Sequence, residues 1–339
     1  MATKQPRVRV LLAATALLLA PWATAQNVVI KMATLVPQGS AWYTTVQEMA
    51  QEWQKLSGGK VTLRLYPGGV AGDDSDVVRK MRLGTLDAGL ITAAGLADID
   101  RAVFALAVPM AYDSYEEFDH VLGKMSPQLE KTYADKGFIV LNWADAGWIH
   151  FFTKSAMRTP DELKGMKVFT WSGDNPAVEI WKAAGFNPVP LPSTEISTAL
   201  QTGLVNALPT TPQAAVLLQW YNHAKYMNDL PWAVLLGGTV ITRSGWEKIP
   251  ADLRPALLAS AQETARKLRE QTRSGADRDV QAMEKRGLTV VHVDAATEAV
   301  WRKTAEGAYP RVREVFVPAA AFDAAMAFRD EYRKVKGDR

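Results

Sequence analysis

The stretch that decides the fold lies between residues 28 and 92, where five segments of regular pattern follow one another. They read VVIKM at 28–32, AWYTTVQEMAQEWQKL at 41–56, VTLRLY at 61–66, DVVRKMRL at 76–83 and AGLIT at 88–92. The first, third and fifth segments predict strands, whereas the second and fourth predict helices. Strands alternating with helices in this way are typical of an α/β unit with a largely parallel sheet.

The same alternation restarts further along the chain and predicts a second unit. Three more strands are expected, at 138–143, 148–153 and 167–171. Three more helices are expected, one opening at 159–162, one at 176–184 and one at 193–201. Pro160 suits a first helical turn, and Ser193 or Thr194 would cap the last of these helices. Two such units in tandem predict two lobes.

The segment 250–286 keeps apolar and small residues at helical spacing from Leu257 to Met283. One helix of this length would measure about 50 Å, more than one small lobe, so we expect it to lie across both lobes. Gly275 is a possible point of bending. The predicted fold is therefore α/β, with two lobes, central mixed sheets and a long helix spanning both. We expect one lobe at 26–147 plus about 236–276, and the other at 148–235 plus about 277–339 with the C-terminal helices.

Residues 1–25 have the pattern of a secretory signal peptide. Three basic residues precede an apolar run at 10–20, and Ala23, Thr24 and Ala25 form an A-x-A cleavage site. The apolar run has 11 residues, well short of the roughly 20 that a membrane-spanning helix needs. We therefore expect cleavage after Ala25 and an exported protein, with an uncleaved anchor as the alternative.

Charge and cysteine content exclude several classes of protein. The leader holds three of the 39 Lys and Arg residues, so the 314 residues after it carry 36 basic and 36 acidic side chains. This balance leaves no basic field that would attract nucleic acid. The absence of cysteine excludes disulfides, thiolate metal sites and cysteine nucleophiles.

No motif for catalysis or metal binding is present. The four histidines (His120, His150, His223 and His292) lie far apart, so none forms a zinc-binding pair on one helix. The acidic run DDSD at 73–76 lacks the glycine and distal glutamate of a calcium-binding EF-hand loop, and we interpret it as a helix cap. Nucleophile elbows, P-loops and dinucleotide motifs are absent. We expect no enzyme, cofactor or metal site.

Aromatic residues gather in the middle of the chain. Six of them fall between residues 143 and 171: Trp143, Trp148, Phe151, Phe152, Phe169 and Trp171. Phe169 and Trp171 share one face of a predicted strand and lie close to Asp174 and Asn175 in sequence. Flat indoles with a single N–H group suit a small organic ligand, although strand aromatics also build cores.

Several motifs together point to one family. They are Tyr66-Pro67 followed by GDD at 72–74, LGTLD at 83–87, TPDELKGMK at 159–167 and ALQTG at 199–203. From about 30 to 328, the chain resembles the substrate-binding proteins of tripartite ATP-independent periplasmic (TRAP) transporters, the DctP-like family. The resemblance implies a two-lobed periplasmic-binding-protein fold whose cleft closes on a small-molecule solute. It also implies a periplasmic location and TRAP permease membrane subunits as partners.

The chain departs from this family at two positions. The resemblance implies an arginine on the strand at 167–171 that holds a substrate carboxylate, but Phe169 stands there. A second arginine of the sialic-acid-binding branch aligns near Ile149. Apolar side chains cannot replace a planar guanidinium. We therefore expect an aromatic or otherwise atypical solute, with any carboxylate held by hydroxyls, amides or backbone N–H groups.

The candidate solute-binding residues combine these aromatics with positions that the resemblance places near the cleft. They are Gln38, Trp42, Thr92, Trp148, Phe169, Trp171, Asp174, Asn175, Thr210, Thr211, Gln213 and Trp232. Each could instead be a turn, cap or core residue, and Asp174 would favour a cationic group.

Two other functions stay open at the level of sequence. A receptor of an ATP-driven (ABC) importer also has two α/β lobes, although the long helix and the motif at 159–167 argue against it. An exported hydrolase would need a triad assembled in three dimensions. The tail at 319–339 is helical in pattern, and it would cover the protein's own surface or that of a partner, so a monomer and a dimer are both expected alternatives.

Overall fold

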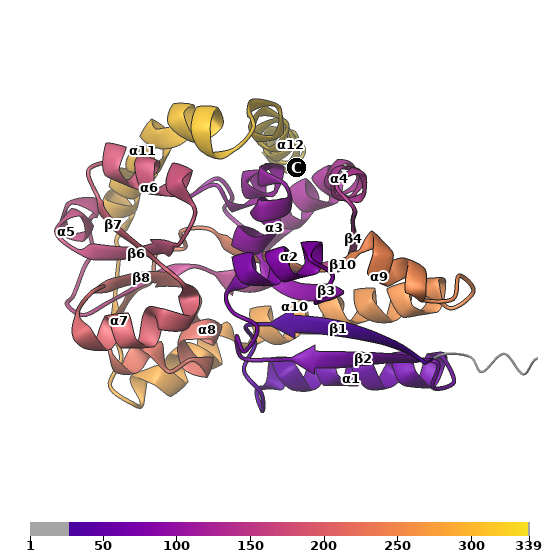
Figure 1. The fold of residues 1–339 in the computed structure, drawn as a ribbon. Coiled ribbons are helices and arrows are strands. Elements are labelled where there is room, and N and C mark those ends of the chain that lie inside the picture. Colours follow the sequence, from indigo (N-terminus) through magenta and orange to yellow (C-terminus); the bar gives the residue numbers. More distant parts are fainter. Residues whose placement is uncertain (1–26, 338–339) are drawn as a thin grey trace, which may run out of the picture.

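Two β-sheets, one in each lobe, organise residues 27–337, the part of the chain that this computed structural model describes (Figure 1). The predicted leader at 1–25 lies outside the described residues. The first sheet has the order β2-β1-β3-β10-β4. Its strands are β1 (Val28–Thr34), β2 (Val61–Tyr66), β3 (Ala88–Thr92), β4 (Phe138–Trp148) and β10 (Val234–Thr242).

The first sheet is mixed. Strands β1, β2 and β3 run parallel, whereas β10 inserts antiparallel between β3 and β4. Alternate residues of each strand face opposite layers: Met32 packs towards α1 and the long helix α10 (Arg254–Glu284), and Ala33 packs towards α2, α3 and α4. The helices of this lobe are α1 (Ala41–Leu56), α2 (Asp74–Arg82), α3 (Ala93–Ile99), η1 (Arg101–Ala107), α4 (Tyr115–Asp135) and α9 (Arg243–Lys248).

The second sheet has the order β11-β9-β5-β8-β6-β7 and is also mixed. Its strands are β5 (His150–Thr153), β6 (Lys167–Trp171), β7 (Asn187–Leu191), β8 (Ala207–Thr210), β9 (Tyr226–Asn228) and β11 (Thr289–Val291). The helices around it are α5 (Pro160–Lys164), α6 (Asn175–Ala183), η2 (Ser193–Glu195), α7 (Ile196–Thr202), α8 (Pro212–Leu217) and η3 (Trp220–Asn222).

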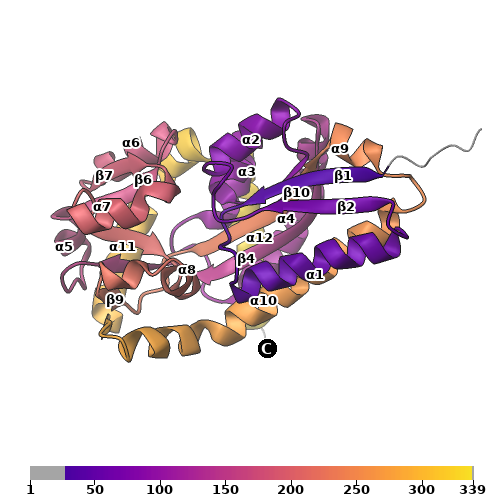
Figure 2. The same cartoon turned by 60° about the horizontal axis from the view of Figure 1, so that its bottom comes forward.

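Helix α10 (Arg254–Glu284) crosses from one lobe to the other (Figure 2). Its 31 residues correspond to about 46 Å. Leu257 and Leu268 join the core of the first lobe, and Met283 joins that of the second. Asn142 of β4 fixes the helix on the first sheet, because its Nδ2 donates to the carbonyl of Ala261 at 2.7 Å. The predicted spanning helix is confirmed, and it continues through Gly275 without a break.

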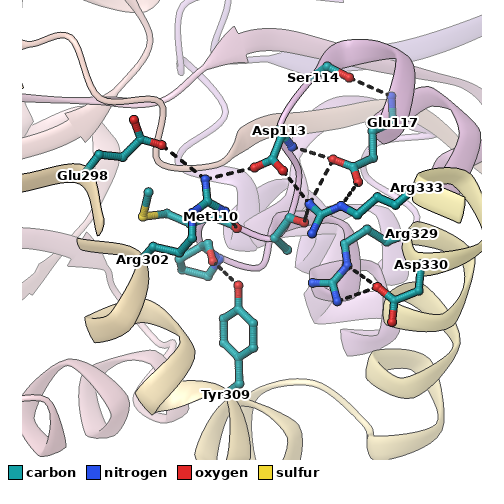
Figure 3. Close-up of polar contacts among 12 residues, drawn as sticks. Met110, Asp113, Ser114, Glu117, Glu298, Arg302, Tyr309, Arg329, Asp330 and Arg333 are labelled. Carbon is teal, nitrogen blue, oxygen red and sulfur yellow. Dashed lines mark hydrogen bonds and ion pairs between the residues drawn. The ribbon is translucent and has the colours of Figure 1, made fainter. Parts of the chain in front are cut away.

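The C-terminal helices join the lobes a second time. Helix α11 (Ala295–Arg311) contributes Trp301 to a core of the second lobe, a π-helical turn η4 (Val312–Phe316) follows, and α12 (Ala319–Gly337) packs on α4 of the first lobe. Arg302 and Arg333 both pair with Asp113, at 3.0 and 2.8 Å (Figure 3). The tail therefore covers the protein's own surface.

Two local predictions were wrong. Trp148 ends β4 in the first sheet instead of opening the strand of the second, which begins at His150. Neither Ser193 nor Thr194 caps a helix; the hydroxyl of Ser193 donates instead to Oδ1 of Asp73, in the first lobe, at 2.6 Å. A tertiary partner thus replaces the expected local one. The run at 73–76 does form a helix start, because Asp73 caps α2.

Candidate solute-binding cavity

A cavity of about 480 Å³ lies between the two lobes. Thr92, Trp171 and Thr210 belong to its wall, and they are the last residues of β3, β6 and β8. Ligands of α/β proteins bind at this place, outside the carboxyl ends of strands, where the loops leave a crevice. The volume is within the range of small-molecule sites.

The wall of the cavity is strongly aromatic. Nine aromatic side chains line it: Trp42, Phe104, Phe169, Trp171, Trp181, Phe186, Trp220, Trp232 and Phe316. Phe169 and Trp171 meet edge to face with ring centroids 5.5 Å apart, which is a favourable arrangement of two aromatic rings. Both lobes and the C-terminal segment therefore contribute flat apolar surface.

Helix α6 turns an apolar stripe towards this cavity. Ala177, Ile180, Trp181 and Ala184 line the wall at the i, i+3, i+4, i+7 spacing of one helix face. No residue of α6 is buried, because Ile180, Trp181 and Ala184 pack only partly on the neighbouring cores and also face the cavity. Apolar surface left uncovered inside a cleft marks a place for an apolar partner.

Asp174 is the one ionisable side chain among the described residues that line the cavity. Burial raises the pKa of its carboxyl group, against the opposing effect of Arg101, whose Nη2 donates to Oδ1 at 3.1 Å. Asp174 also caps α6, since the same oxygen accepts from the N–H of Ala177. The one carboxylate of the wall therefore already has its cation.

Apart from Asp174 and the indole N–H groups, the polar side chains of the wall are hydroxyls and one amide. The indole N–H of Trp42 donates to Oγ1 of Thr272 at 3.1 Å, and that hydroxyl donates to Oε1 of Gln213 at 3.0 Å. Thr272 belongs to α10 and is buried. The long helix thereby orients one wall residue from each lobe.

A smaller pocket of about 70 Å³ adjoins the cavity and shares Trp42 and Thr92 with it. Asp74 lies in its wall, fully buried. Oδ2 of Asp74 accepts from the N–H and the hydroxyl of Thr92, at 2.8 and 2.7 Å, whereas Oδ1 has no partner among the described residues. Burial raises the pKa of this carboxyl group to about 7.

The structure brings eight of the twelve predicted residues together in the cavity wall. They are Trp42, Thr92, Phe169, Trp171, Asp174, Thr210, Gln213 and Trp232. The other four lie outside it. Gln38 and Asn175 are exposed, Thr211 is buried as the cap of α8, and Trp148 packs against Tyr115 at 5.3 Å between ring centroids.

Several wall residues were not predicted from the sequence, and they come from the helices of the second lobe and from the C-terminal segment. Trp181 had a signal, the apolar stripe of its helix, whereas Trp220 and Phe316 come from short turns without periodicity. The indole N–H of Trp220 donates to Oγ of Ser197 at 3.1 Å, which fixes the ring at the wall.

Residues 27–337 lack two further features. No group of three or more His, Cys, Asp or Glu side chains in this range is placed to hold a metal ion. No helix in the same range has the length and apolar character needed to cross a membrane.

Comparisons with known proteins agree with this architecture. A solute-binding protein of Roseobacter denitrificans is 28% identical over 311 residues, which cover 87% of this chain and 92% of that protein. The 2,3-diketo-L-gulonate-binding periplasmic protein YiaO of Escherichia coli K12 is 24% identical over 267 residues, covering 78% of this chain and 79% of its own.

Solved structures share the fold. A TRAP periplasmic solute-binding protein of Xanthobacter autotrophicus Py2, with bound β-D-galacturonate, superposes with a TM-score of 0.81 at 19% identity, over 89% of this chain and 99% of its own. The profile of the bacterial extracellular solute-binding proteins, family 7 (DctP), matches residues 32–314. The chain therefore belongs to this family, the solute-binding proteins of TRAP transporters.

Proposed function

We propose that this receptor captures an aromatic or otherwise largely apolar solute in the cavity between its lobes and delivers it to a TRAP permease in the membrane. The observation that carries the proposal is the wall itself, with nine aromatic rings and Asp174 as its one ionisable side chain. An apolar wall binds by burying apolar area.

Two of the proteins named above are printed with a sugar acid, 2,3-diketo-L-gulonate for YiaO and β-D-galacturonate for the Xanthobacter protein, which suggests an organic acid as the general class. Here Phe169, which is 3% exposed, occupies the strand position at which the resemblance implies an arginine. No Arg, Lys or His side chain belongs to the wall among the described residues. A carboxylate on the solute would be held by the hydroxyl of Thr210 or the amide of Gln213, because the hydroxyl of Thr92 already donates to Asp74.

Binding couples to closure of the lobes in this proposal. Trp42 and Thr92 lie on one lobe, Phe169 and Trp171 on the other, so a solute touches both walls when the cleft is closed. A ligand stabilises the conformation in which it makes more contacts. The closed receptor would then dock on the permease. We assign the protein to the periplasm, with the signal peptide removed after Ala25.

A thermal-shift panel tests the proposal. Indole-3-ethanol and indole-3-acetate serve as aromatic probes, and succinate and galacturonate serve as dicarboxylate and sugar-acid probes. Since a ligand at 100 times its Kd stabilises by about 2.7 kcal/mol, a probe that binds should raise Tm by several degrees. Stabilisation by either indole, with none by succinate or galacturonate, supports the proposal. Stabilisation by succinate or galacturonate, with none by either indole, contradicts it.

A pair of tryptophan variants localises the binding. Trp171→Ala removes an aromatic wall residue, and it should weaken indole binding about tenfold or more, as expected for one lost aromatic contact of about 1.4 kcal/mol. Trp246→Ala is the matched control, because Trp246 lies on α9, outside the cavity wall. Equal loss of binding in both variants would contradict a cavity site.

A further inference from the structure

Two loops, one from each lobe, meet beside the cavity at Asp73 and Ser193. Both oxygens of the Asp73 carboxylate accept from Ser193: Oδ1 from its hydroxyl at 2.6 Å and Oδ2 from its backbone N–H at 3.1 Å. Asp73 is 8% exposed, and Ser193 belongs to the cavity wall. Two hydrogen bonds to a carboxylate that is shielded from water are stronger than neutral bonds at the surface.

The loop that carries Asp73 is fixed on the first lobe. It leads from β2 to α2, and the N–H of Gly69 donates to the carbonyl of Thr34 at 3.1 Å. Gly69 has a φ of +74°, and a Cβ atom at this residue would lie 3.0 Å from Cγ2 of Thr194 in the second lobe. The two loops therefore approach closely at a second point, and glycine permits this approach.

These contacts belong to the part of the lobe interface that can open. The chain crosses between the two sheets at 149 and at 229–233, and α10 also joins the lobes covalently. The bonds between Asp73 and Ser193 are not covalent, and they join residues that are 120 positions apart. Separation of the lobes breaks these bonds, whereas the crossing segments remain.

We propose that Asp73 and Ser193 form a clasp that holds the cleft closed over the solute and sets how slowly the solute leaves. This inference rests on the proposed function, in which closure of the lobes encloses the solute. The bonds exist only where the two loops meet, so they favour the closed form by their own free energy. Asp73 is a positioning residue, because it lies outside the cavity wall and acts through Ser193.

A clasp of this kind acts on release and not on entry. The solute enters the open form, which lacks the bonds, so the association rate does not depend on them. Release requires opening, which breaks them, and most differences in affinity between related complexes arise at this step. A hydrogen bond to a charged group contributes a factor of about ten or more. Loss of the bond should therefore speed release.

Fluorescent labels on the two lobes measure closure and release. The chain has no cysteine, so Leu83→Cys and Thr198→Cys provide the only attachment sites for a donor and an acceptor dye. Leu83 ends α2 at 69% exposure, and Thr198 is an exposed residue of α7. Energy transfer between the dyes reports the distance between the lobes. Indole-3-acetate and indole-3-ethanol serve as solutes, and stopped-flow mixing and dilution give the rates of association and release.

The variants are compared in this labelled protein. Ser193→Ala removes the hydroxyl and should speed release about tenfold or more, with the association rate unchanged. Asp73→Ser removes the carboxylate, keeps a good helix cap for α2 and should also speed release. Ser172→Ala is the matched control, because Ser172 is an exposed serine of the same lobe outside the cavity wall. Both of its rates should equal those of the labelled protein without further substitution.

The double variant distinguishes a clasp from a direct contact between Ser193 and the solute. If the hydroxyl acts through Asp73, Ser193→Ala should speed release by less than about threefold in the Asp73→Ser background, because its charged partner is already gone. A direct contact with the solute would give the same factor in both backgrounds.

Three results would overturn the inference. They are an unchanged release rate in Ser193→Ala, a loss of affinity that arises from slower association, and an equal effect of Ser193→Ala in both backgrounds. Each leaves the proposed function standing if an indole still binds. Failure of both indoles to bind the protein without these substitutions contradicts the proposed function, and this inference with it.

Discussion

Asp74 is expected to make the stability of the solute-free protein depend on pH. Its carboxyl group is buried beside the cavity, with one oxygen unpartnered, and burial raises its pKa from 3.8 to about 7. The folded state therefore holds the proton more tightly than the unfolded chain. As pH rises from 4 to 7, the unfolded chain loses this proton first, so the free energy of unfolding falls. At about 1.4 kcal/mol per pKa unit, the change is about 4 kcal/mol at most.

Asp74→Asn removes this titration and keeps an oxygen that accepts from Thr92. Urea unfolding at pH 4, 5.5, 7 and 8 compares the variant with the wild-type protein, so that contributions of all other groups cancel. The free energy of unfolding of the variant, taken relative to that of the wild-type protein, should rise by about 2–4 kcal/mol between pH 4 and pH 8. The control Asp252→Asn, at an exposed position before α10, should differ by less than about 0.5 kcal/mol throughout. A difference between Asp74→Asn and wild type that does not change with pH would refute the reasoning.

Three further substitutions test the elements that join the lobes. Trp301→Ala should lower the free energy of unfolding by about 3–5 kcal/mol in urea, because the indole is fully buried and stacks on Phe151 at 5.3 Å between centroids; a loss under 1 kcal/mol would refute this packing. Arg333→Ala should lower the free energy of unfolding by about 3 kcal/mol, since it leaves the buried carboxylate of Glu117 without its cation. Arg333→Lys should restore part of that loss. Ala265→Pro interrupts α10 at a buried position and should lower the free energy of unfolding by about 3 kcal/mol or more. A circular dichroism spectrum and an indole affinity that both match the wild-type protein would contradict a continuous helix.

Elements with a strong local pattern were predictable from the sequence. The helix at 41–56 and the strands at 61–66, 88–92 and 167–171 have the predicted bounds, because each has its own periodicity or its own terminating residues. The spanning helix α10 was predictable for the same reason, since its small and apolar residues keep one spacing over nine turns or so. The α/β class and the two lobes follow from these elements.

Contacts made across the chain were not predictable. Ser193 has the residue type of a helix cap, yet its hydroxyl bonds to Asp73, 120 positions away. Trp148 was expected in the wall because it lies among aromatics, but the strand that carries it belongs to the first sheet and its ring packs on Tyr115. Likewise, Trp220 and Phe316 reach the cavity only because turns far apart in sequence meet there.

The central claim is that the cavity takes a largely apolar, aromatic solute without a guanidinium in its wall. The most direct test is to purify the protein from cells without denaturation, weigh the complex by native mass spectrometry and identify the solute released on unfolding. A bound aromatic molecule, lost in Trp171→Ala and kept in Trp246→Ala, is the predicted result. A sugar acid or a C4-dicarboxylate released from the cavity would contradict the claim.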